Sequence, residues 1–415
     1  MRGTFIGLII VAAIAFGGTS AGSTQVPSAA LPPVQVAVTG DPAPVETLRL
    51  AILTTTRALV PEARTGPVLL AETEPPLQPL RAASEMALRA VVQVGPAGAK
   101  PPMTVPVAIK NQATPWADAQ ALLVSNSPET LPFGKGLLSG AVTSGQTVRL
   151  LYHHANGSAT ERMAIVVNFS NPDRVPAALW VTGAAGDSGA DELALGHAAA
   201  RTFLDQYWHR AGFLLRIPAN TSVPLFIHDL APGAVATGLT QFTLVEGART
   251  NVQVYARLAG EMDPPPMSFA PNFDQVHQRG LFARPQVVRS LSYTVGGQFA
   301  MMSVGDGQDA LAESSTGRIL SGNYGVVYSF AIDVDNPSPL STILGIMMQA
   351  VAGEAGGMFL VDDRVIDVPR VRSGERRLVT TLHLAPGERR TLMISTMPES
   401  GGFYPIRLTV GTRYQ

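Results

Sequence analysis

The chain has 415 residues, which is more than one ordinary domain needs, and its net charge at neutral pH is −1. Hydrophobic residues make up 46% of the sequence and charged residues only 15%, a balance that fills hydrophobic cores and excludes an extended disordered chain. The near-zero charge excludes a general attraction to nucleic acid or anionic lipid, and the lack of cysteine excludes disulfides and thiolate metal sites.

The first residues have the pattern of a secretory signal peptide. Arg2 precedes an apolar run over residues 5–16, and small residues follow. Because this run is shorter than the roughly 20 residues that cross a bilayer, we predict a signal peptide at 1–21 that is cut near Ala21. The alternative is an uncleaved N-terminal anchor. No later segment is apolar enough for a membrane span, so we expect an exported chain that is periplasmic, cell-surface or extracellular.

Residues 22–115 are predicted to form a Pro/Ala-rich linker and a poorly defined N-terminal region. The segment LRLAILTTTRALV at 48–60 fits a helix by its Leu, Ala and Arg content and a strand by its Ile, Val and Thr content, so both stay open. The apolar spacing in 78–94 predicts a short helix. The segment 101–112 is predicted as a strand, and Pro106 within it indicates an edge position.

From residue 116 onward, short runs rich in Val, Leu, Ile, Tyr and Phe alternate with clusters of Gly, Pro, Asn and Asp. This spacing predicts a mainly β protein with two antiparallel β-sandwich domains. We place the first sandwich at 116–260, a Pro-rich connection at 261–281 and the second sandwich at 282–415.

The two predicted sandwiches share a layout that indicates a divergent duplication. VVNFSNPDRVPAALWV at 166–181 and AIDVDNPSPLSTILGI at 331–346 both have the pattern strand, Asn-Pro turn, strand. Leu-Ala-Pro-Gly turns follow within 228–235 and 383–390, and a helix is inserted in the first copy. The alternative is that two common turn types arose independently.

One amphipathic helix is predicted at 188–211, inserted in the first sandwich. Ser188 is expected as its N-cap, and Gly212 is expected to end it. His197 falls on the apolar face of this helix. It is either a metal ligand or general base at the mouth of the sandwich, or a half-buried histidine that is hydrogen-bonded to a backbone carbonyl. We favour the second interpretation.

The adjacent His153 and His154 raise the question of a metal site. Side chains alternate between the two faces of a strand, so a regular strand turns these rings apart. Zinc needs three or four protein ligands, and the further candidates, His197 and His228, show no ligand spacing to the pair. We therefore expect no metal and no cofactor, and we keep these four histidines as candidate binding residues.

Four residues outside the predicted cores are candidates for a contact between the sandwiches. They are His277, Arg279, Phe282 and Tyr324, in NFDQVHQRGLFARP and GNYGVVYSF. The alternative is that they attach the connection to the second sandwich.

No Walker loop, dinucleotide fingerprint, nucleophile elbow or arginine stripe occurs in the sequence. Only three of the 30 basic residues are lysines, a composition typical of bacteria with GC-rich genomes. We therefore expect an exported non-catalytic β-sandwich protein, a binding or structural module of the cell envelope or extracellular space. Its partner would be a cell-wall or surface glycan or another envelope protein, and not nucleic acid. The alternative is a secreted hydrolase or metal-dependent enzyme with its site between helix 188–211 and the first sandwich.

Overall fold

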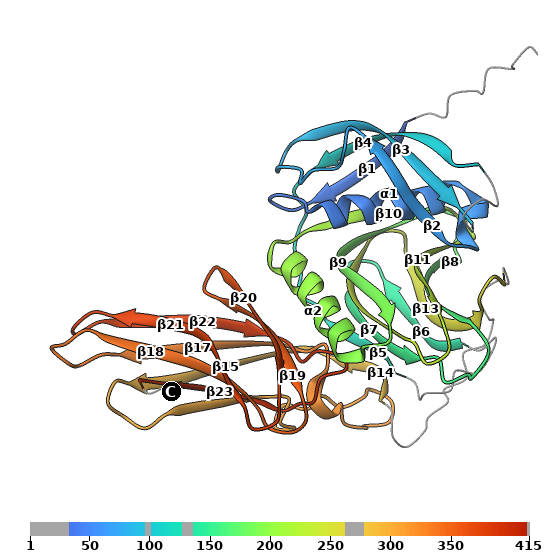
Figure 1. Cartoon of the computed structure of the whole chain (residues 1–415). Helices are drawn as coiled ribbons and strands as arrows, with labels where there is room; N and C mark the ends of the chain where they lie inside the picture. Colours follow the sequence, from blue (N-terminus) through green and yellow to red (C-terminus); the bar gives the residue numbers. More distant parts are fainter. Residues whose placement is uncertain (1–32, 96–100, 127–135, 262–277, 413–415) are drawn as a thin grey trace, which may run out of the picture. The chain divides into compact units, whose positions relative to one another are not determined.

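β-Strands dominate the described chain, which confirms the predicted mainly β fold class (Figure 1). The predicted signal peptide at 1–21 and His277 lie outside the residues that the computed structural model describes, which are 33–95, 101–126, 136–261 and 278–412. Within these ranges, no helix has both the length and the apolar character that a membrane crossing requires.

The first sandwich contains a ten-stranded and a four-stranded sheet. In sheet order, the ten strands are β14 (Arg279–Ala283), β5 (Ala121–Asn126), β7 (Thr147–Ala155), β12 (Val235–Glu246), β9 (Ala177–Gly189), β10 (Gly212–Ile217), β1 (Val34–Thr39), β4 (Met103–Asn111), β3 (Glu85–Val94) and β2 (Val68–Glu74). The four strands are β11 (Thr221–Leu230), β8 (Met163–Asn171), β13 (Arg249–Leu258) and β6 (Gly136–Thr143). Phe169 on β8 and Phe242 on β12 meet edge to face in their common core, with ring centroids 4.9 Å apart.

The described residues of the N-terminal region, 33–95 and 101–115, contain strands that extend the ten-stranded sheet, which corrects the prediction of a poorly defined region there, whereas residues 22–32 of the predicted linker lie outside the described part of the chain. Its strands β1 to β4 continue the sheet beyond β10. Residues 48–59 of the ambiguous segment belong to helix α1 (Val45–Leu59), Val60 is its C-cap, and the short 3₁₀ helix η1 (Pro61–Arg64) follows. The threonines fit this helix because the hydroxyls of Thr54 and Thr56 donate to carbonyls four residues earlier.

Two predictions of secondary structure in this region were wrong. Residues 85–94 form strand β3 where a helix was predicted, because Leu88, Ala90 and Val92 alternate inward and bury one face. Strand β4 lies between β1 and β3 and is not an edge strand. Pro106 is tolerated there because the pairing of β4 with β1 begins only at Val107.

The predicted inserted helix is α2 (Glu192–Trp208), and it begins later than expected. Its N-cap is Asp191, whose carboxylate accepts the N–H of Ala194 at 3.0 Å. Ser188, the predicted N-cap, is still part of β9. The helix packs on β9 and β12 of the ten-stranded sheet and on β19 and β20 of the second sandwich.

The second sandwich consists of a five-stranded and a four-stranded sheet. In sheet order, the first contains β15 (Gln286–Thr294), β17 (Val327–Asp335), β22 (Arg389–Thr396), β19 (Ala355–Val361) and β20 (Arg364–Val371). The second contains β16 (Ala300–Val304), β23 (Ile406–Gly411), β18 (Thr342–Ala350) and β21 (Arg376–Leu384). A short 3₁₀ helix, η2 (Ser321–Asn323), precedes β17.

The sheets and their boundary differ from the prediction in two respects. Strand β14 pairs with β5 in the first sandwich, so part of the predicted connection 261–281 belongs to the first sheet, and the strands of the second sandwich begin at Gln286. The sheets are also not purely antiparallel, because β1 runs parallel to β4, β5 to β7 and β15 to β17.

The two sandwiches share a strand order that fits the predicted repeat. The order β7-β12-β9-β10 corresponds to β16-β23-β18-β21, and α2 follows β9 where the β19–β20 hairpin follows β18. Asn171 and Asn336 each donate to the carbonyl four residues later. Asn336 also donates to Ala385, whereas Asn171 donates to Pro218, so the β10–β11 turn is the counterpart of the second Leu-Ala-Pro-Gly turn. The duplication itself stays a prediction.

A single hydrophobic cluster joins α2, the first sheet and the second sandwich. It includes Leu151 of β7 and Phe203 of α2 together with Phe330 and Ile394 of the second sandwich. Residues 33–415 accordingly belong to one compact unit. The contacts between α2 and the second sandwich position the candidate functional site.

Candidate functional site

The two adjacent histidines on β7 point into different surroundings. His154 is fully buried, and its Nε2 lies 3.0 Å from the Ser125 hydroxyl on β5. Burial, followed by the charges of His153 and Arg279, lowers the pKa of His154 well below its ordinary value, so this ring is neutral. His154 is therefore a core residue.

His153 faces α2 and binds a carboxylate. Its Nε2 donates to Oε1 of Glu192, in the first turn of α2, over 2.8 Å. This hydrogen bond lowers the pKa of Glu192, so the carboxylate is charged at neutral pH. The other ring nitrogen of His153, Nδ1, is buried and has no hydrogen-bond partner.

His228 belongs to the core of the first sandwich. The Tyr152 hydroxyl lies 2.7 Å from its Nε2, and burial lowers the pKa of His228 to about 4, so the ring is neutral. Gly186 and Gly238 leave the space that this tyrosine occupies, because a Cβ at either glycine would overlap the hydroxyl. A structural role accounts for His228.

His197 connects α2 to the second sandwich through two carboxylates. Its Nδ1 lies 2.8 Å from Glu399 and its Nε2 lies 2.8 Å from Asp367 on β20. Burial opposes protonation of the ring, but the hydrogen bonds and charges of Glu399 and Asp367 outweigh burial and raise the pKa of His197 to about 9. The predicted bond to a backbone carbonyl is therefore wrong, because two acidic side chains bind the ring instead.

The four candidate histidines do not converge. Each binds a different partner, and across the described ranges no three His, Asp or Glu side chains are grouped so that they could hold a metal ion.

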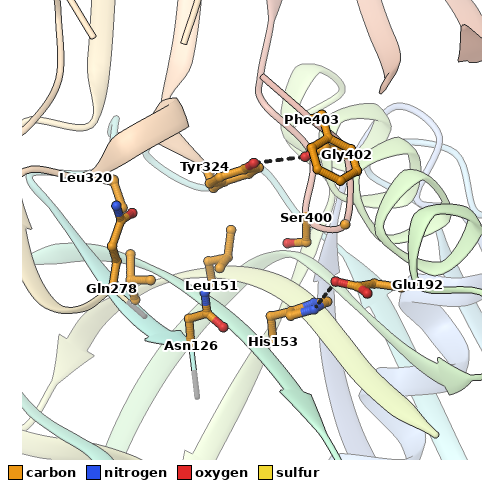
Figure 2. A pocket seen from close by; sticks show the side chains of 12 residues that line it. Asn126, Leu151, His153, Glu192, Gln278, Leu320, Tyr324, Ser400, Gly402 and Phe403 are labelled. Atoms are coloured by element: carbon orange, nitrogen blue, oxygen red, sulfur yellow. Dashed lines mark hydrogen bonds and ion pairs between the residues drawn. The ribbon is translucent and has the colours of Figure 1, made fainter. Parts of the chain in front are cut away.

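A cleft of about 220 Å³ opens beside His153 (Figure 2). We refer to it as the cleft. Its walls come from β5 and β7, from the first turn of α2, and from the second sandwich. The lining residues are Val124, Asn126, Leu151, His153, Glu192, Gln278, Leu320, Tyr324, Ser400, Gly401, Gly402 and Phe403. The first and second sandwiches thus both contribute polar groups to one opening.

Two polar atoms on the lining residues are buried and unpartnered. They are Nδ1 of His153 and the hydroxyl of Ser400. A buried polar atom without a partner costs roughly 1–3 kcal/mol, so a ligand that binds these atoms recovers that free energy. The Phe403 ring adds an exposed apolar surface, since the residue is 58% exposed.

A tight contact with α2 positions the wall that carries Ser400. Gly196 of α2 lies so close that a Cβ there would overlap the Ser400 carbonyl. Gly401 has a φ of +76°, a conformation that favours glycine, and a Cβ there would overlap the Glu192 carbonyl. The Tyr324 hydroxyl donates to the Gly402 carbonyl at 2.8 Å, which joins the same wall to the segment before β17 (Figure 2).

A second hollow, of about 290 Å³, lies between α1, β9 and α2. Its lining includes the apolar residues Leu50, Leu53 and Phe226 and the charged residues Glu46 and Arg49. None of its lining residues carries a buried polar atom without a partner. The cleft beside His153 is therefore a better candidate for a binding site than this second hollow.

Three of the four residues that were predicted as candidates for a contact between the sandwiches lie in the described part of the chain, and their surroundings differ. Arg279 lies on β14, and its Nε donates to the Asn126 carbonyl at 3.0 Å. Phe282, also on β14, is buried in the hydrophobic cluster that includes α2 and the second sandwich. Tyr324 lines the cleft with His153. Arg279 and Phe282 thus belong to the first sheet, and Tyr324 belongs to the second sandwich.

Sequence reasoning missed Glu192 as a partner of His153, and it missed the segment that carries Glu399 and Ser400. The segment that carries Glu399 and Ser400 could have been noticed in the sequence. It is the run Glu-Ser-Gly-Gly-Phe-Tyr-Pro at 399–405, which combines acidic, hydroxyl and aromatic groups with turn-forming residues. Its partners lie about 200 positions earlier, and no local pattern connects the two.

No protein-family model matches this chain, and no curated protein matches it. Similar solved structures include tripeptidyl peptidase 2, with 10% identity and a TM-score of 0.17 over 81% of this chain and 26% of that one. Lac15 from a marine microbial metagenome has 13% identity and a TM-score of 0.12, covering 78% and 70% of the two chains. The CupB6 tip adhesin from Pseudomonas aeruginosa has 11% identity and a TM-score of 0.16, covering 69% and 89%. This chain spans about a quarter of the first of these, and none of the three carries an argument about fold or function.

The raised pKa of His197 predicts that stability falls at alkaline pH. Its folded-state pKa of about 9 lies above the ordinary 6.5, so its stabilising contribution is complete below pH 6.5 and is lost as the pH rises through 9. The difference in Tm between the unmodified chain and His197→Gln should be large near pH 6 and should shrink toward about pH 10. His383→Gln, at an exposed position on β21, is the matched control. A difference that is constant with pH would contradict this assignment.

Proposed function

We propose that this chain is an exported, non-catalytic binding protein, and that its cleft binds a sugar unit of a cell-wall or surface glycan. The observation that carries the proposal is the pair of buried, unpartnered polar atoms, His153 Nδ1 and the Ser400 hydroxyl, in an open cleft. The proposed location is the periplasm, the cell surface or the extracellular space, and it is supported by the signal-like pattern at 1–21.

The chemistry of the cleft favours a small polyhydroxylated ligand. Asn126 and Gln278 offer amides that both donate and accept hydrogen bonds, and the Glu192 carboxylate accepts. The Phe403 ring offers an apolar surface for the C–H face of a sugar. At about 220 Å³, the cleft is smaller than the roughly 300–1,000 Å³ of sites for drug-sized ligands. One unit of a polymer, with the remainder outside, fits this size.

The lining residues support binding more than hydrolysis. Glycoside hydrolysis by the common mechanisms uses two carboxyl groups on either side of the scissile bond, and the residues that line the cleft include one, Glu192. One observation favours the alternative of a secreted hydrolase, because Ser400 and the hydrogen-bonded pair His153–Glu192 share the cleft. The Ser400 hydroxyl makes no hydrogen bond to His153, however, which a serine nucleophile needs for activation.

Titration calorimetry with soluble peptidoglycan fragments and N-acetylglucosamine oligomers tests the proposal. We expect saturable binding, and we expect Ser400→Ala and Phe403→Ala each to weaken it about tenfold, since each removes one contact worth roughly 1.4 kcal/mol. Phe299→Ala is the matched control, because Phe299 is 51% exposed and is not among the lining residues of the cleft. It should leave affinity unchanged.

Two results would replace this proposal. Equal affinity of the Ser400→Ala and unmodified chains would place the sugar elsewhere. Turnover of p-nitrophenyl esters that is lost in Ser400→Ala would favour the secreted hydrolase.

A further inference from the structure

The outer face of the sheet β16-β23-β18-β21 carries an exposed apolar row beside an arginine row. The strand register aligns Met301, Thr409, Met347 and Leu378 in one line across all four strands. Met301 is 60% exposed and Leu378 is 46% exposed. Phe299, which is 51% exposed, lies over Gly411, two residues beyond Thr409 on β23, because a Cβ on that glycine would overlap its ring.

The neighbouring row is basic. Here the register aligns Ser303, Arg407, Gln349 and Arg376, and both arginines are exposed. The ion pairs of the described residues include neither Arg376 nor Arg407. The four strands contain three arginines and no Asp or Glu.

The opposite sheet of this sandwich differs in its charges. There Arg389 pairs with Asp335 and Arg390 pairs with Asp362. On the sheet β16-β23-β18-β21, by contrast, the exposed apolar row lies beside two exposed arginines, Arg376 and Arg407, that appear in none of the ion pairs of the described residues. Its complement is a partner that is both anionic and apolar.

We propose that this face docks on a lipid surface that contains anionic headgroups. Met301, Leu378 and Phe299 would enter the boundary between headgroups and acyl chains, and Arg376 and Arg407 would bind phosphates at the rim. Methionine suits such a surface because its side chain is unbranched and adapts its shape. The proposal is independent of the ligand of the cleft.

The dimensions of the face favour a lipid surface over a protein partner. Four strands at about 4.8 Å spacing give a row only about 15 Å wide. A stable protein interface buries about 800 Å² on each partner and uses roughly 20–30 residues. Shallow insertion into lipid needs only a few apolar side chains, and each basic residue near an anionic surface strengthens binding about fivefold.

Vesicle flotation with residues 33–415 tests the proposal, since this segment is one compact unit and lacks the apolar run at 5–16. The probes are vesicles of phosphatidylcholine alone and of phosphatidylcholine mixed with phosphatidylglycerol. We expect binding to the anionic vesicles that weakens at high salt. The double variant Arg376→Gln/Arg407→Gln should lower the partition coefficient about 25-fold, and Met301→Ser/Leu378→Ser should lower it at least tenfold.

The opposite sheet offers a matched control. Val288 on β15 is 77% exposed and Met393 on β22 is 46% exposed, so Val288→Ser/Met393→Ser removes comparable apolar surface. This variant should bind vesicles like the unmodified segment, and circular dichroism should show the same fold for all variants. If the unmodified segment binds neither vesicle, or if the control loses as much binding as Met301→Ser/Leu378→Ser, the face does not dock on lipid. A protein partner would then be the remaining occupant.

Discussion

Replacing Gly196 by alanine is expected to destabilise the chain by about 2–3 kcal/mol, the cost of inserting a group into a filled space. In an ordinary helix interior the same change stabilises by roughly 0.5–1 kcal/mol, because glycine loses more backbone freedom on folding. The expected change in the free energy of unfolding therefore has the opposite sign to the one that helix propensity alone predicts. Urea unfolding at neutral pH measures it.

The reversed sign follows from the contact between α2 and the wall of the cleft. Gly196 is buried, and a Cβ there would overlap the Ser400 carbonyl. The helix and the wall cannot move apart easily at this point, because two further contacts flank it. Gly401 lies close to the Glu192 carbonyl, and His197 forms a hydrogen bond with Glu399. The alanine methyl group must therefore separate the helix from the wall.

Gly189→Ala is the control for Gly196→Ala. Gly189 ends β9 just before α2, and a Cβ there would meet Leu195 at 3.6 Å, which is ordinary van der Waals contact. This change should alter the free energy of unfolding by less than about 0.5 kcal/mol. A Gly196→Ala chain as stable as the unmodified one would show that the helix and the wall are not in close contact.

The sequence predicted the strands of the two sandwiches better than the N-terminal region. Strands such as 163–171 carry continuous apolar runs between turn residues, and that pattern is local. Strand β3, EMALRAVVQV, begins with Glu, Met, Ala, Leu, Arg and Ala, which favour helices, and continues with valines, which favour strands. It becomes a strand because β2 and β4 pair with it on both sides and because Leu88, Ala90 and Val92 alternate inward, which outweighs the helix preference of the other residues.

The candidate site was predictable only in part, for the same reason. Alternation along β7 correctly indicated that His153 and His154 point apart. The partners that define their roles come from elsewhere in the chain, since Ser125 belongs to β5 and Glu192 to α2. The contact of His197 with Glu399 joins residues 202 positions apart. Only the folded chain brings these groups together.

Replacing Arg149 by methionine should produce the other large effect, a loss of about 2–6 kcal/mol of unfolding free energy, since two buried acceptors each lose their partner at a cost of roughly 1–3 kcal/mol. Arg149 on β7 is fully buried, and its guanidinium donates to the Gly325 carbonyl at 2.8 Å and to Gln241 at 3.0 Å. It also lies 5.4 Å from the ring centres of Phe203 and Tyr207 on α2. One side chain thus joins the first sheet, the helix and the second sandwich.

Methionine has a similar volume but no donors, so the carbonyl of Gly325 and the amide oxygen of Gln241 lose their partner in a buried place. Arg149→Lys should recover only part of the loss, since an ammonium cannot form the planar fork or stack on the rings of Phe203 and Tyr207. Because this contact crosses from the first sheet to the second sandwich, we expect urea unfolding of Arg149→Met to separate into two transitions.

Arg216→Met provides the comparison for Arg149→Met. The Arg216 side chain is 63% exposed and pairs with Glu246 at 2.8 Å, and exposed pairs contribute roughly 0–1 kcal/mol. Burial lowers the pKa of Arg149, which shows that the surroundings oppose its charge. An Arg149→Met chain that is as stable as Arg216→Met would therefore mean that relief from burying the charge compensates for the lost hydrogen bonds. A loss confined to Arg149→Met would show that the hydrogen bonds of this buried guanidinium stabilise the contact between the two sandwiches.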